Sequence, residues 1–114
     1  MVKYIFLIII SLVFSGCKID CDLLAETCRE ENCQIIVKKI PDSESGHNFE
    51  IEGKSLKTGK DTIYDEENRW FCSFYKFIEV NDTIIKRKNE LTFNIHKQDT
   101  ILTFNWDCEG KIYK

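Results

Sequence analysis

The feature that most constrains this chain is its N-terminal stretch, residues 1–16. The stretch starts with a single positive charge at Lys3, continues with an apolar run over residues 5–14 and ends in the small pair Ser15-Gly16. A charged start, a short apolar core and small residues before a cleavage site are the three parts of a secretory signal. The sequence therefore predicts an exported protein in which residues 17–114 remain to fold as one small domain.

The residue after the small pair is a cysteine, and Phe14-Ser15-Gly16-Cys17 resembles the lipobox of bacterial lipoproteins. This resemblance implies that the chain is cut before Cys17, that the Cys17 thiol receives a diacylglycerol, and that a fatty acid such as palmitate acylates the new N-terminus. Several acyl chains give firm anchoring, because one chain alone binds a bilayer only marginally. The implied location is the bacterial cell envelope, lipid-anchored on the periplasmic or surface face of the outer membrane.

A permanent membrane-spanning helix is the main alternative for the apolar run. As a helix, residues 4–14 would be about 17 Å long, whereas the hydrocarbon layer of a bilayer is about 30 Å thick. We therefore expect a cleaved signal peptide at 1–16 rather than a transmembrane anchor.

The segment 17–22 is the predicted tether between the lipid and a domain at 23–114. Asp20 and Asp22 lie close behind Cys17. Acidic residues at this place are similar to the surface-export signal of Bacteroidota lipoproteins, so the resemblance extends to that kind of envelope protein.

The charge of the chain limits its partners. The formal net charge is −3, and removal of Lys3 with the signal makes the mature chain more acidic. A nucleic-acid partner would require a basic stripe, which this balance argues against. The same balance argues against electrostatic adhesion to anionic lipids, so we expect the acyl chains on Cys17 to make the membrane contact.

The sequence gives little sign of catalysis or of a bound cofactor. It contains no Gly-x-Ser-x-Gly elbow, no His-Glu-x-x-His and no phosphate-binding loop. Its two histidines, His47 and His96, lie far apart, and the spacing of Cys28 and Cys33 has no second close pair to complete a zinc site. We expect a non-enzymatic protein with no metal, no cofactor and no catalytic residue.

In an exported chain, cysteines are expected to form disulfides rather than to remain free thiols. The candidates besides Cys17 are Cys21, Cys28, Cys33, Cys72 and Cys108. Five cysteines predict two bridges and one leftover thiol, with the connectivity left open. The favoured pair is Cys72–Cys108, on predicted core-facing strand positions, and the second bridge is expected within the group Cys21, Cys28 and Cys33.

Hydrophobic periodicity predicts a mainly β fold. Residues 22–32 have helical spacing and a possible cap at Asp22, after which the apolar residues recur with a period of two. The predicted strands lie at 34–40, 47–53, 61–64, 69–80, 83–86, 91–96, 100–108 and 111–114. Strands at hairpin spacing predict a small antiparallel sheet that curls into a barrel or sandwich, with one short helix after the signal peptide.

The predicted strand at 69–80 is apolar on both faces. Such a strand is either central and covered, or it presents an aromatic surface to a ligand. In the second case Phe71, Tyr75 and Phe77 form the possible ligand surface, which could stack on sugar rings or anchor a protein. A domain this small needs its aromatic residues for a core, which favours the first case.

The tripeptide Asp-Thr-Ile occurs at 61–63, 82–84 and 99–101. Local chemistry explains it, since Asp ends a turn and Thr-Ile starts a β-branched strand. The tripeptide is also similar to the Asp-Ser/Thr-aliphatic motif at which Bacteroidota O-glycosylate exported proteins, so Thr62, Thr83 and Thr100 are possible glycosylation sites.

Two functional hypotheses follow. The first is an anchored protein-binding module at the envelope, for example an inhibitor or immunity-type partner of a lytic enzyme, by analogy with small lipidated inhibitors of lysozyme. The second is a carbohydrate-binding surface protein that uses the aromatic residues of 70–77.

Overall fold

The structure is a computed structural model that describes residues 19–40 and 47–114. Its elements in chain order are α2 (Cys21–Glu30), β1 (Cys33–Lys39), β2 (Asn48–Ser55), β3 (Asp61–Glu67), α3 (Arg69–Cys72), the 3₁₀ helix η1 (Tyr75–Phe77), β4 (Thr83–Lys86), β5 (Thr92–His96), β6 (Ile101–Cys108) and β7 (Lys111–Tyr113). The predicted signal peptide and the predicted lipidation site, Cys17, lie outside the described residues. No helix within those residues is long and apolar enough to cross a membrane.

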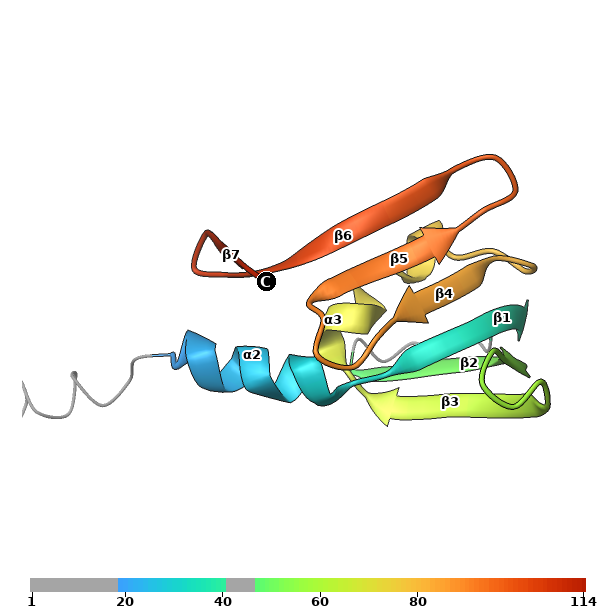
Figure 1. Ribbon diagram of the computed structural model, residues 1–114, viewed down its shortest axis with the longest axis horizontal. Helices are drawn as coiled ribbons and strands as arrows, with labels where there is room; N and C mark the ends of the chain where they lie inside the picture. The colour runs from blue at the N-terminus through green and yellow to red at the C-terminus, as the bar shows by residue number, and fades with distance from the viewer. Residues whose placement is uncertain (1–18, 41–46) are drawn as a thin grey trace, which may run out of the picture.

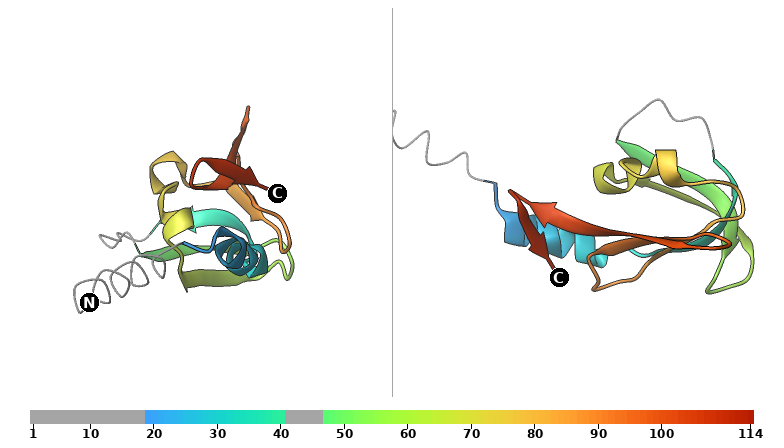
Figure 2. Two further views of the ribbon diagram at one scale, coloured as in Figure 1. Left: turned by 90° about the vertical axis from the view of Figure 1, so that its left-hand side faces the viewer. Right: turned by 90° about the horizontal axis from the view of Figure 1, so that it is seen from above.

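The strands form one antiparallel sheet of seven in the order β3-β2-β1-β4-β5-β6-β7 (Figure 1). The prediction of a mainly β, antiparallel fold with a short N-terminal helix is confirmed. The sheet curls around α3 and η1 without closing into a barrel (Figure 2), because β3 and β7 stay at opposite ends of the strand order.

The N-terminal cap of helix α2 lies two residues before the predicted one. The side chain of Asp20, not of Asp22, accepts a hydrogen bond from the Leu23 backbone N–H at 3.1 Å. Asp22 lies in the first turn, where its negative charge suits the positive end of the helix dipole. At its other end the helix meets the fully buried side chain of Lys86, whose ammonium donates to backbone carbonyls there.

The main core lies on the inner face of the sheet. Strand burial alternates with the predicted period of two, and the buried members are Cys33, Ile35, Val37, Phe49, Ile51, Ile84, Phe93 and Ile95. Segment 69–78 covers this face and contributes Phe71, Phe74 and Ile78. An apolar sheet face of this kind needs a covering layer, because the strands alone leave one side of the core in water.

The prediction of a strand at 69–80 is wrong, because this segment forms α3 and η1. The Asn68 side chain accepts from the Phe71 backbone N–H at 3.0 Å, which starts a helical turn where a strand was expected. Phe71, Phe74 and Ile78 then reach the core together at spacings of three and four. Apolar residues spaced three and four apart for helical turns fall on both faces when the same segment is read as a strand. This is why 69–80 was predicted to be a strand with two apolar faces.

A smaller cluster joins α2 to the C-terminal hairpin. Its buried members are Ala25, Leu91 and Trp106. Figures 1 and 2 show α2 and the β6–β7 hairpin extending to the same side of the sheet. Trp70 packs against both this cluster and the main core, so α3 connects the two.

The one disulfide of the described residues joins Cys21 to Cys108, with a Cα–Cα distance of 5.8 Å. The favoured Cys72–Cys108 pairing is therefore wrong, because Cys72 lies on α3 while Cys108 ends β6 beside the start of α2. The second bridge is not formed either. Cys28 packs on the smaller cluster and Cys33 enters the main core, so both remain thiols together with Cys72.

Candidate binding site at the β3 edge

Strand β3 is the terminal strand of the sheet and is exposed along its length. Only Tyr64 of its seven residues is partly buried. The strand pairs with β2 along one side, and no described strand pairs with its other side. A free edge presents unpaired backbone N–H and C=O groups that another chain can use.

The ends of the β2–β3 ladder fix which backbone groups point outward. The Ser55 N–H donates to the Lys60 carbonyl at 2.9 Å, and the Asn68 N–H donates to the His47 carbonyl at 2.8 Å. Because bonded and non-bonded pairs alternate along antiparallel strands, residues 62, 64 and 66 bond to β2. The backbone groups of residues 61, 63, 65 and 67 therefore point away from the sheet.

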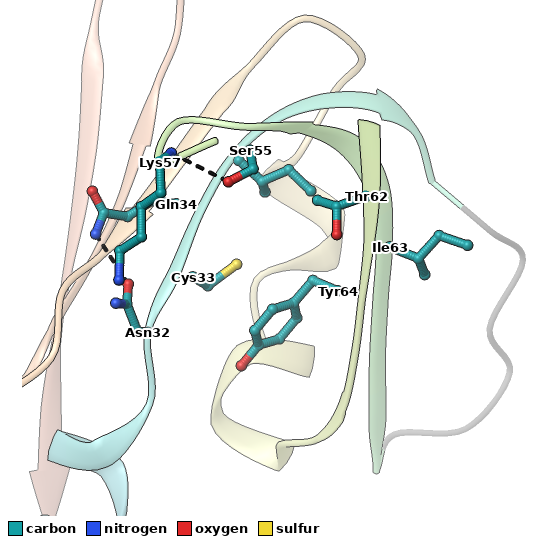
Figure 3. A pocket seen from close by; sticks show the side chains of 9 residues that line it. Asn32, Cys33, Gln34, Ser55, Lys57, Thr62, Ile63 and Tyr64 are labelled. Atoms are coloured by element: carbon teal, nitrogen blue, oxygen red, sulfur yellow. Dashed lines mark hydrogen bonds between the residues drawn. The ribbon is translucent and has the colours of Figure 1, made fainter. Parts of the chain in front are cut away.

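The inner face beside this edge carries a hollow of about 310 Å³, which we call the inner hollow (Figure 3). Its lining includes Cys33, Ser55, Thr62, Tyr64 and the polar pair Asn32 and Gln34. The side-chain amide of Gln34 donates to that of Asn32 at 3.0 Å. Short and hydroxyl-bearing side chains in this lining leave the space beside the edge strand unfilled.

Two groups of the inner hollow, the Cys33 thiol and the Tyr64 hydroxyl, are held in their protonated forms. Burial, with the charge of Glu31, raises the pKa of the Cys33 thiol to about 12. Burial also raises the pKa of Tyr64, whose hydroxyl donates to the Glu31 carboxylate at 3.0 Å. A thiol needs its thiolate form to act as a nucleophile, so this arrangement suits binding of a neutral side chain rather than covalent chemistry.

The outer face of the same edge carries a second hollow of about 390 Å³, which we call the outer hollow. It lies over Gly53 and is bordered by Lys38, Glu52, Asp61 and Ile63. A Cβ atom at Gly53 would lie 2.0 Å from the Ile36 carbonyl oxygen, so β1 and β2 approach closely only with glycine there. The edge strand is therefore flanked by space on both faces.

Carboxylates dominate the outer face of β2 and β3. Glu50 lies opposite Asp65 in the ladder, and Asn48 lies opposite Glu67. Asp65 accepts a hydrogen bond from the Asn48 amide at 2.6 Å. At the far end of the strand, Lys38 lies 2.7 Å from the Asp61 carboxylate and lowers the pKa of that group.

No family model, curated protein or solved structure matches this chain.

The aromatic residues of the predicted ligand surface do not share an exposed face. Phe71 is fully buried, and Tyr75 is partly buried with its hydroxyl accepting from the Glu50 backbone N–H at 2.6 Å. Phe77 is 36% exposed and packs its ring on Phe104. The carbohydrate-binding hypothesis loses the aromatic platform on which it rested.

The three threonines of the Asp-Thr-Ile tripeptides lie in different settings. Thr62 is exposed on β3 between the two hollows, and Thr100 is exposed just before β6. Thr83 is half-buried at the start of β4, beside a buried Asp82 that pairs with Lys97. Glycosylation stays a prediction, and Thr62 is the position at which a glycan would cover the β3 edge.

The sequence predicted the first part of this edge strand, at 61–64, and β3 continues through Glu67. Charged side chains concentrated along a strand are typical of edges, and that signal was present in Asp65, Glu66 and Glu67. No group of three histidine, cysteine or carboxylate side chains suited to a metal ion occurs in the described residues.

Proposed function

We propose that this protein is a lipid-anchored, non-enzymatic module of the bacterial cell envelope that binds another protein along the β3 edge. The membrane partner is the bilayer that receives the acyl chains on Cys17. An inhibitor or immunity-type protein would use such an edge to hold a segment of a lytic enzyme.

The exposed edge of β3 is the observation that carries the binding proposal. Four residues direct backbone donors and acceptors outward, and hollows on both faces can receive alternate side chains of an added strand. Strand addition uses these two elements, because the backbone bonds give affinity and the side-chain hollows give specificity.

The anchoring proposal rests on the lipobox-like segment that ends at Cys17. Helix α2 begins at Cys21, four positions further on. Four residues span at most about 14 Å even when fully extended. An anchored molecule would therefore hold its domain close to the membrane, within reach of other envelope proteins.

A photocrosslinker can test the edge in intact cells. We would place benzoylphenylalanine at Ile63, which is 56% exposed on β3, and separately at Ile101, which is 57% exposed on β6. The expected result is a discrete adduct from position 63 and none of that mass from position 101. An identical adduct from both positions, or one from position 101 alone, would overturn the binding surface proposed here.

Metabolic labelling tests the anchor independently. Cells given an alkyne analogue of palmitate should label the wild-type protein, and a Cys17→Ser variant should lose the label and accumulate with its signal peptide attached. A Cys28→Ser variant is the matched control and should label normally. Equal labelling of the Cys17 variant would exclude lipidation at this residue.

A further inference from the structure

We infer that the segment bound at the β3 edge is an extended cationic strand, with lysine or arginine at alternate positions facing the outer side. This inference rests on the proposed function, because it names the class of partner for the same edge. It follows from the distribution of charge along β2 and β3 and from the positions of the two hollows.

The two ends of the edge differ in charge. Near Asp61 the lysines Lys38 and Lys54 both lower the pKa of the carboxyl group, so the negative charge there is compensated. Near the other end no described lysine or arginine forms an ion pair with Glu50, Asp65 or Glu67. This second half of the edge is the part left for a partner to neutralise.

The register of an added strand follows from the alternation of β3. A partner residue directly opposite Asp65 or Glu67 has its side chain on the outer face, where a basic group meets the carboxylates. The residue opposite Ile63 lies over the outer hollow and is best apolar. Residues opposite Thr62 and Tyr64 turn to the inner hollow, whose lining suits small uncharged side chains.

A second copy of this chain is a poor occupant of the same edge. An antiparallel β3 pair centred on Tyr64 would place Asp61 opposite Glu67 of the other copy. A pair centred on Asp65 would place that carboxylate opposite itself, and a pair centred on Ile63 would place Asp61 opposite Asp65. Like charges directly opposite are destabilising, so these carboxylates disfavour self-association. The effect is strongest in the register centred on Asp65, since Asp61 already has Lys38 beside it.

A pair of synthetic peptides tests the charge preference on the full chain in neutral detergent. One labelled peptide has the sequence Thr-Lys-Thr-Lys-Thr-Val-Thr, and the other has glutamate in place of both lysines. We expect the lysine peptide to bind at least about fivefold more tightly, from two cross-strand charge pairs. The difference should shrink as salt is added, because exposed charges are screened.

Charge reversal gives the sharper measurement. The double variant Asp65→Lys with Glu67→Lys changes exposed side chains and should reverse the preference, so that the glutamate peptide binds more tightly. The control variant Asp99→Lys with Asp107→Lys makes the same change of net charge at exposed positions away from β3, and should keep the wild-type preference. Matching thermal unfolding curves would establish that both variants fold.

The outcomes separate this inference from the function on which it rests. If position 63 crosslinks to a partner but the peptides bind equally and the reversal has no effect, the edge binds a protein and the cationic class is wrong. If neither peptide binds and position 63 gives no adduct, the edge itself is not a binding surface. A preference that reverses equally in the control variant would mean that net charge alone, not β3, selects the peptide.

Discussion

The Lys86 ammonium lies 2.7 Å from the backbone carbonyl oxygen of Glu31, at the passage from α2 into β1. It also donates to the carbonyls of Arg29 at 3.3 Å and Arg87 at 2.9 Å. Burial lowers the pKa of this lysine, which is fully enclosed. Its charge faces the negative end of the α2 dipole, so one side chain caps the helix and fixes it to β4.

Replacement of this lysine tests how much the cap stabilises the fold. We expect Lys86→Met to lower the free energy of unfolding by about 3 kcal/mol, because buried carbonyls lose their donor. Urea unfolding measures the effect. Lys88→Met, at an exposed neighbour, should change the free energy by less than about 0.5 kcal/mol, and a comparable loss in both variants would remove the special role of Lys86.

The buried thiol of Cys33 predicts a loss of stability at alkaline pH. Its pKa is about 12 in the folded protein against an ordinary value of 9.0, so the unfolded chain releases this proton first. The stabilisation is complete below pH 9.0 and is lost as pH rises toward 12, by up to about 1.4 kcal/mol per pH unit. The raised pKa of Tyr64 acts in the same direction at higher pH.

Urea unfolding at about pH 8 and about pH 10.5 would measure this dependence. A Cys33→Val variant should lose about 2 kcal/mol less than the wild type between those two conditions. Ile35→Val, which alters the same core without removing a thiol, should retain the wild-type dependence. Equal losses in all three proteins would show that Cys33 does not set the alkaline limit.

The disulfide assignment makes opposite predictions for two cysteines. Cys21→Ser should lower the free energy of unfolding by about 4 kcal/mol, since the bridge closes a long loop. Cys72→Ser should cost less than about 1 kcal/mol, because a half-buried free thiol is replaced. Peptide mapping without reduction should find Cys21 linked to Cys108, and a Cys72–Cys108 peptide would contradict the structure.

Proline substitution distinguishes binding at the β3 edge from stability of the sheet. The N–H of Ile63 points outward, so Ile63→Pro should keep the free energy of unfolding within about 1 kcal/mol while it abolishes binding of the lysine peptide. Tyr64→Pro removes an N–H that bonds to β2 and should cost about 3 kcal/mol or more. Normal binding by the Ile63 variant would contradict strand addition at this edge.

The sequence predictions were accurate where the alternation of apolar and polar residues alone set the structure. Alternation between neighbours placed β1 at 34–40 against an observed Cys33–Lys39, and placed β6 from residue 100 to its observed end at Cys108. The segment 69–80 starts in a helix because the Asn68 side chain caps a helical turn. A pattern of period two does not reveal such a cap. The period of two in this segment was clear in the sequence, but the hydrogen bond from the Phe71 N–H to Asn68 that competes with a strand was not.

The site depended on interactions that no local pattern contains. Cys21 meets Cys108 across 87 residues only because α2 lies beside the last long strand. In the same way, β3 becomes an edge through the strand order, which is fixed by the packing of the whole sheet. The acidic composition of residues 61–67 indicated exposure, and the structure supplied the direction of each backbone group.

The position of the bridge decides where a mechanical load would enter an anchored molecule. Cys21 is the first residue of α2, and Cys108 is the last of β6. Tension arriving from a lipid on Cys17 would therefore cross the sulfur–sulfur bond into the C-terminal hairpin as well as into the helix. Helix α2 cannot be peeled from its N-terminal end while that bond is intact. Reduction of the disulfide would remove this second path for the force. The packing of Ala25, Leu91 and Trp106 would then be what holds α2 to the C-terminal hairpin under tension.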